Sequence, residues 1–131
     1  MPKAITSFCA VKVNQSHIYL IGGEYKDSDG VWTKVDEVYI INPLDNFSHI
    51  QGPSLLNGRS NHKCAVMHKG DTSKILVMGG HGSSGIVEDA EILDISQNQW
   101  IEGKKKCTST SVQTDTNISL PYHANIIILC N

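Results

Sequence analysis

The chain has 131 residues and a mass of 14.3 kDa, which is the size of one domain. Apolar residues make up 40% of the chain and charged residues 18%, a balance that is too apolar for an intrinsically disordered protein. The net charge is −2 and no apolar run approaches the roughly 20 residues of a membrane span, so we expect neither a nucleic-acid nor a membrane partner.

The cysteines are far apart in the chain, and no two of them form a C-x-x-C pair: Cys9, Cys64, Cys107 and Cys130. Residues 1–8 show no apolar core of a secretory signal. We therefore expect four reduced thiols and a cytoplasmic location. Three N-glycosylation acceptor tripeptides, which begin at Asn14, Asn46 and Asn117, favour the alternative of a secreted protein.

Residues 3–52 predict a unit of four short strands. Cys9-Ala10-Val11 lies in the first, and residues 18–21 form the second, which Gly22-Gly23 closes. Residues 36–40, which include Tyr39, belong to the third, and Phe47 marks the fourth. Turn-forming residues between short β-branched runs favour strands over helices.

The same features recur in the same order in residues 59–103. Cys64-Ala65-Val66 repeats the first triplet and Gly79-Gly80 the diglycine, while Ile92 takes the place of Tyr39 and Trp100 that of Phe47. The expected strands of this second copy are Lys63 to His68, Lys74 to Met78, Ala90 to Ile95 and Gln99 to Glu102.

Residues 19–21 and 75–78 are continuous apolar runs rather than alternating ones. A strand has this pattern when both of its faces are buried. An antiparallel four-stranded unit buried on both faces needs a similar unit on each side, and the radial repetition of a β-propeller supplies one.

These residues resemble kelch repeats, whose marks are a diglycine, a Tyr and a Trp at a period of about 50 residues. Residues 52–62 also resemble the P-x-x-x-x-R-S-x-H stretch that precedes the first strand in that family. The resemblance implies an all-β partial kelch-type β-propeller with two four-stranded antiparallel blades plus one strand of a third. The repeat-motif residues are Gly22, Gly23, Tyr39, Phe47, Gly79, Gly80 and Trp100.

The predicted organisation is a single partial propeller, with repeat 1 at about 3–52 and repeat 2 at about 59–103. Residues 104–118 are polar and rich in Ser and Thr, which predicts a loop, and residues 119–131 read as the start of repeat 3. Two blades leave open faces and strand edges. We therefore expect the chain to need further blades, to self-associate or to be marginally stable.

No catalytic, metal or cofactor site is expected. Residues 80–85 fit the G-x-G-x-x-G pattern of dinucleotide sites, but the strand and diglycine recur at Gly22-Gly23 without a third glycine, so the repeat accounts for both copies. The six histidines show no zinc-ligand spacing, and no G-x-S-x-G elbow is present.

The resemblance implies a non-catalytic module that binds a partner protein with the loops after each diglycine and the loop that enters the first strand. Arg59 is expected to present an exposed guanidinium to a partner carboxylate. Trp32 is expected to act as an interface anchor, with blade packing as the alternative. The expected partner-binding residues are Arg59, Ser60, Trp32, Tyr25 and His81.

The sequence does not identify the partner protein; the resemblance implies a ubiquitin-ligase substrate or a cytoskeletal protein as candidate classes. Two alternatives stay open: a fragment of a propeller-type enzyme with oxidase-like or isomerase-like activity, and an inert truncated product.

Overall fold

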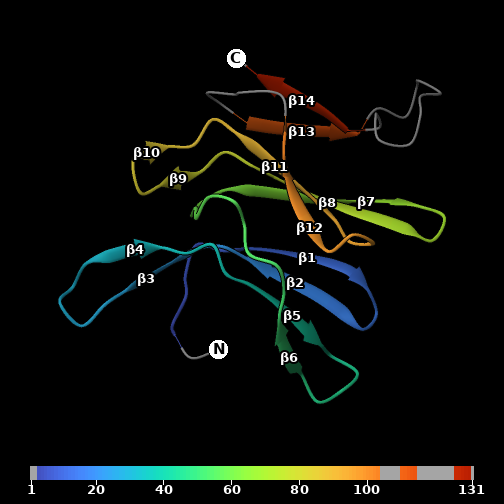
Figure 1. Cartoon of the computed structure of the whole chain (residues 1–131), viewed down its shortest axis with the longest axis horizontal. Helices are drawn as coiled ribbons and strands as arrows, with labels where there is room; N and C mark the ends of the chain where they lie inside the picture. Colours follow the sequence, from blue (N-terminus) through green and yellow to red (C-terminus); the bar gives the residue numbers. More distant parts are fainter. Residues whose placement is uncertain (1–2, 104–109, 115–125, 131) are drawn as a thin grey trace.

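The computed structural model describes residues 3–103, 110–114 and 126–130 and contains two four-stranded antiparallel sheets, blade 1 and blade 2 (Figure 1). Blade 1 has the strand order β1-β2-β5-β6, with β1 (Cys9–Asn14), β2 (His17–Ile21), β5 (Val38–Asn42) and β6 (Ser48–Gln51). Blade 2 has the order β12-β11-β8-β7, with β7 (Lys63–Lys69), β8 (Thr72–Met78), β11 (Ala90–Asp94) and β12 (Gln99–Glu102). The all-β fold class and its two four-stranded blades are confirmed.

Three two-stranded sheets accompany the blades. Two of them are hairpins inserted after the second strand of each blade, and the third is formed near the end of the chain. Their strands are β3 (Glu24–Lys26) with β4 (Trp32–Lys34), β9 (His81–Gly82) with β10 (Gly85–Ile86), and β13 (Thr110–Thr114) with β14 (Ile126–Cys130).

The predicted loop over 104–118 is wrong for residues 110–114. These residues form β13, which pairs antiparallel with β14 so that Thr110 lies opposite Cys130 and Thr114 opposite Ile126. A segment rich in Ser and Thr predicts a loop by polarity, but Thr and Val are also strand-forming residues. The rest of that loop, and residues 119–125 of the expected third repeat, lie outside the described residues.

The core lies between the two blades. Tyr19 and Ile21 of β2 share one buried cluster with Ile75 and Val77 of β8. Leu76 and Met78, which alternate with the latter pair along β8, are buried on the other face of blade 2. Successive side chains of a strand point to opposite faces, so β8 is covered on both sides, as its continuous apolar run predicts.

The blades meet through opposite faces of the repeat. Ile21 and Met78 each stand immediately before a diglycine, but Ile21 faces the other blade and Met78 faces away from it. Side-by-side repetition of one unit produces this arrangement, because each unit turns one face to its predecessor and the other to its successor.

The antiparallel order places the connections at two ends of the blades. The turns after β1, β5, β7 and β11 lie at one end, called here the turn face (Figure 1). The β3–β4 and β9–β10 hairpins lie at the other, and with the linker of residues 53–62 they form the hairpin face. No helix among the described residues is long and apolar enough to span a bilayer.

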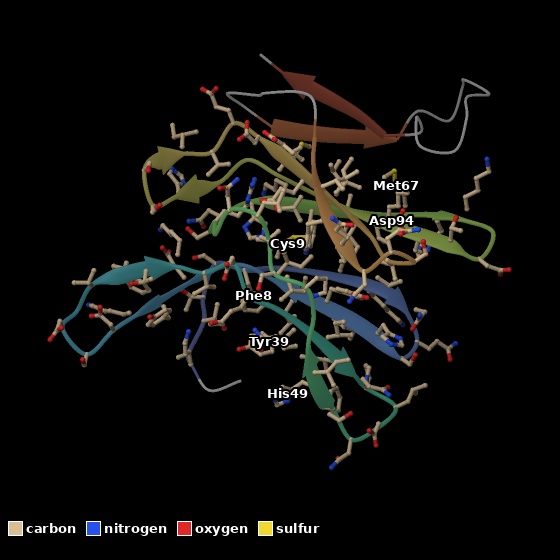
Figure 2. The ribbon with its side chains drawn as sticks, in the orientation of Figure 1. Phe8, Cys9, Tyr39, His49, Met67 and Asp94 are labelled. Atoms are coloured by element: carbon tan, nitrogen blue, oxygen red, sulfur yellow. A yellow bond between two sulfur atoms is a disulfide. The ribbon has the colours of Figure 1, made fainter. Side chains whose placement is uncertain are left out.

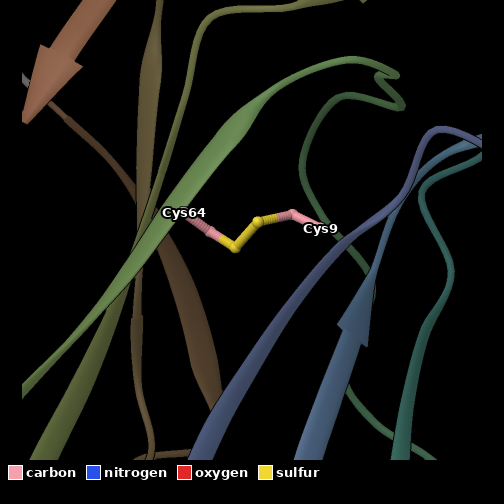
Figure 3. The surroundings of a disulfide bond; sticks show 2 residues. All are labelled: Cys9 and Cys64. Carbon is pink, nitrogen blue, oxygen red and sulfur yellow. A yellow bond between two sulfur atoms is a disulfide. The ribbon is translucent and has the colours of Figure 1, made fainter.

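A disulfide bond between Cys9 of β1 and Cys64 of β7 joins the blades (Figure 3). Their Cα atoms are 6.2 Å apart. The expectation of reduced thiols is therefore wrong for this pair, because the spacing of cysteines in a sequence does not show which strands will face each other. The side chains of Cys107 and Cys130 lie outside the described part of the chain.

Candidate binding face

The diglycines hold the linker against the ends of β2 and β8. The amide of Gly22 donates to the Glu37 carbonyl at 2.9 Å, and that of Gly23 donates to the Arg59 carbonyl at 2.7 Å. Gly22 has φ +61°, and a Cβ there would lie 2.7 Å from the Arg59 carbonyl oxygen. Glycine is needed because the backbone is left-handed and the linker passes in direct contact with it.

Arg59 is completely buried, so the expectation of an exposed guanidinium is wrong. Its Nη2 donates to Oε2 of Glu91 at 2.5 Å, and its Nη1 donates to the carbonyl oxygens of Asp89 at 2.9 Å and Gly79 at 3.3 Å. The guanidinium therefore binds the linker to blade 2 and is not available to a partner.

Glu91 forms the ion pair with Arg59, and the sequence did not lead us to expect this role. Besides Arg59, its carboxylate accepts hydrogen bonds from the amides of Leu56 at 2.6 Å and Asn57 at 3.2 Å. Glu91 is fully buried in β11. A carboxylate within the apolar run of residues 90–93 signals a buried cation, because an unpaired charge is too costly to bury.

Ser60 and His81 are joined through their backbones, which form a bridge with two hydrogen bonds of 2.9 Å. Ser60 is fully buried, and its hydroxyl donates to Oε2 of Glu24 at 3.4 Å. The His81 side chain is exposed. Of the expected contact residues Arg59, Ser60 and His81, only His81 is therefore exposed on the hairpin face.

The β3–β4 hairpin presents an aromatic side chain to solvent. Trp32 is 52% exposed, and the Lys26 ammonium lies 5.8 Å from the centre of its ring. The exposure argues against the blade-packing alternative for Trp32. Tyr25 is half-buried, packs against the cluster that contains Ile5, and has the Lys3 ammonium 4.7 Å from its ring centre.

Two carboxylates at this face are paired with lysines. Lys34 forms an ion pair with Glu24, and this hydrogen bond lowers the pKa of the Glu24 carboxyl. Lys3 lies 2.7 Å from Glu37, which also accepts from the Tyr39 hydroxyl at 2.8 Å. The Lys3 hydrogen bond, followed by that from Tyr39, lowers the pKa of Glu37.

An open pocket of about 340 Å³ lies between the linker and the β9–β10 hairpin. It is lined by residues 57–58 and 82–89, and its exposed rim includes Ile86, which is 69% exposed, and Glu88. The G-x-G-x-x-G residues form this hairpin, and Gly85 begins β10 rather than a helix. The pocket therefore has a polar rim with one exposed apolar side chain, and the hairpin beside it does not provide the helix N-terminus of a dinucleotide site.

Phe47 was expected at the position of Trp100, and this expectation is wrong. Phe47 lies in the β5–β6 turn with φ +56° and is 68% exposed. His49 pairs with Ile41 as Trp100 pairs with Leu93, and His49 stacks edge-on against Tyr39 at 6.1 Å (Figure 2). The turn in blade 1 is one residue longer, which moves the expected position.

Trp100 of β12 holds the linker through a hydrogen bond. Its side chain is 3% exposed, and its Nε1 donates to the Pro53 carbonyl at 2.8 Å.

The third strands of the two blades, β5 and β11, also align one residue away from the expected match. Tyr39 pairs with Leu20, and Glu91 pairs with Val77, so Glu91 rather than Ile92 takes the place of Tyr39.

His62 is buried beside the diglycines and is 5% exposed. Neither of its ring nitrogens has a hydrogen-bond partner among the described residues. Desolvation, followed by the positive charge of Arg59, lowers the pKa of the imidazole to about 4. His62 is therefore neutral at pH 7 and has a packing role in this structure.

In the part of the chain that the structure describes, no group of three or more His, Cys, Asp and Glu side chains is placed to hold a metal ion.

Comparisons with known proteins identify the repeat and the fold. Residues 71–106 match the Kelch motif, which takes in β8, the β9–β10 hairpin, β11 and Trp100. No curated protein matches the sequence. The solved structure of YjhT is similar, with a TM-score of 0.65 and 18% sequence identity over 82% of this chain, and the chain spans 41% of the length of YjhT. The chain therefore carries a Kelch motif and folds as two blades of a kelch-type β-propeller.

Proposed function

We propose that the chain is a non-catalytic module that binds a partner protein through the hairpin face. The observation that carries this proposal is the exposure of Trp32 and Ile86 on two hairpins that both follow a diglycine. Large apolar side chains on loops held by a rigid scaffold are typical of protein interfaces.

The buried network supports the same role. Arg59, Glu91 and Trp100 bind the linker to blade 2 and so fix the wall of the pocket beside the β9–β10 hairpin. A partner that docks there would meet a preorganised surface, and less conformational entropy would be lost on binding.

Capture of partners by the immobilised full chain tests the proposal when matched variants are compared. Trp32→Ala and Ile86→Ala should each reduce the amount of captured partner at least tenfold. Phe47→Ala removes an aromatic side chain of similar exposure from the turn face and should leave capture unchanged. Equal capture by all three variants would contradict the proposed face.

A further inference from the structure

We propose that Asn14 and Asn46 are N-glycosylation sites and that the turn face of the molecule carries glycans. The proposal rests on the placement of two acceptor tripeptides and on the disulfide, and it is independent of the proposed function.

The two asparagines lie at the same end of blade 1. Asn14 is the last residue of β1, and Asn46 lies in the turn after β5. Because β1 and β5 each pair antiparallel with β2, they run in the same direction, and both strands end at the turn face. Figure 1 shows both turns at the end opposite the β3–β4 hairpin. Glycans at these positions would leave the hairpin face free.

Both acceptor side chains are accessible, and their amide nitrogens are unused. Asn14 and Asn46 are exposed, and no hydrogen bond within the described residues engages the Nδ2 atom of either. Asn46 lies in the β5–β6 turn with φ +50°, a left-handed conformation that Asn adopts more readily than most residues. Attachment of a sugar to Nδ2 would therefore break no interaction of the folded blade.

The acceptor hydroxyl at the first site already contacts the asparagine. Oδ1 of Asn14 accepts hydrogen bonds from the Ser16 amide at 2.9 Å and the Ser16 hydroxyl at 3.0 Å. The tripeptide therefore forms a tight Asx turn that depends only on local contacts. At the second site the Ser48 hydroxyl donates to Asp45 at 2.7 Å.

The disulfide indicates the compartment that such a modification needs. Cys9 and Cys64 are bonded across the blade interface. Structural disulfides persist in oxidising compartments, which include the lumen in which N-glycans are added. The disulfide and the exposed acceptor sites point together to the secretory pathway.

The reaction requires a lipid-pyrophosphate-linked oligosaccharide as the co-substrate. The bond between the first sugar carbon and the pyrophosphate oxygen breaks, and a bond from that carbon to Asn Nδ2 forms. The amide nitrogen loses one proton, and the lipid pyrophosphate is the leaving group. No oxidant or reductant is consumed.

The test expresses the full chain behind a cleavable secretory leader in cultured eukaryotic cells. Total cell protein is treated with peptide-N-glycosidase in ¹⁸O water, which converts each modified Asn to labelled Asp, and peptides are mapped by mass. Label at Asn14 and Asn46 is expected. Because the glycan is added during synthesis, the result does not depend on efficient folding or secretion.

Two pairs of variants provide the controls. Ser16→Ala and Ser48→Ala should abolish label at their own sites, while Ser16→Thr and Ser48→Thr should retain it. Non-reducing peptide mapping of the same sample should show the Cys9–Cys64 bond. A chain that carries this disulfide while Asn14 and Asn46 both lack label would overturn the proposal, and so would label that persists in the Ala variants.

Discussion

Cys9 and Cys64 lie one register position apart in the two blades, and this displacement lets their disulfide cross the interface. Cys9 pairs with Ile21, the residue before Gly22, whereas Cys64 pairs with Val77, one residue further from the diglycine. Adjacent residues of a strand point to opposite faces. Because the blades meet through opposite faces of the repeat, two cysteines at equivalent positions would point the same way and could not bond.

The disulfide should therefore be a main determinant of how firmly the blades are held together. It closes a separation of 55 residues, for which loss of loop-closure entropy in the unfolded chain predicts a contribution of about 4 kcal/mol. Cys9→Ser with Cys64→Ser should lower the free energy of unfolding by about that amount in a urea titration. A reductant should have the same effect on the native chain and none on the double variant; equal midpoints for all samples would contradict this account.

The Arg59–Glu91 pair should be much more costly to break than to replace. Arg59→Met leaves a fully buried carboxylate without its cation and should destabilise the chain by about 3 to 5 kcal/mol. Adding Glu91→Leu removes the orphaned charge, so the double variant should recover part of the loss. Lys74→Met removes the partly exposed ion pair with Asp94, whose charged atoms are 3.9 Å apart, and should cost less than about 1 kcal/mol. Chemical denaturation measures all three, and equal losses for Arg59→Met and Lys74→Met would count against the buried pair.

Strand positions and diglycines could be predicted from the sequence because they depend on local patterns. The apolar run of residues 75–78 and the glycines that follow it have the structure that such patterns indicate. The burial of Arg59 could not be predicted, because an R-S dipeptide does not show that a carboxylate from a later strand will bind the guanidinium. The identical Cys-Ala-Val triplets also suggested equivalent positions, but the two triplets differ by one residue in their register against the second strand of each blade.

Among the glycines with positive φ, Gly80 and Gly70 should differ sharply in their tolerance of alanine. Gly80 has φ +87°, and a Cβ there would clash with the Ser60 carbonyl, whereas Gly70 has φ +57° and open space around it. Gly70→Ala should cost about 1 to 2 kcal/mol from the left-handed backbone alone. Gly80→Ala adds overpacking and should cost roughly 3 to 5 kcal/mol. Thermal unfolding of both variants tests the difference, and similar melting temperatures would show that the linker yields.

Protonation of His62 should make the chain lose stability in mildly acidic solution. Its pKa falls from 6.5 in the unfolded chain to about 4 in the folded one, because burial disfavours the charged ring. A lowered pKa means that the stability is fully present above pH 6.5 and is lost as the pH falls toward 4. Between pH 7.5 and pH 5 the loss should be about 2 kcal/mol.

The paired carboxylates Glu24 and Glu37 have pKa values below 4.5, so the stability that they contribute is lost only at lower pH. Urea titrations of the native chain and of His62→Gln across this range isolate the effect, and parallel curves for the two proteins would assign the acid sensitivity to other groups.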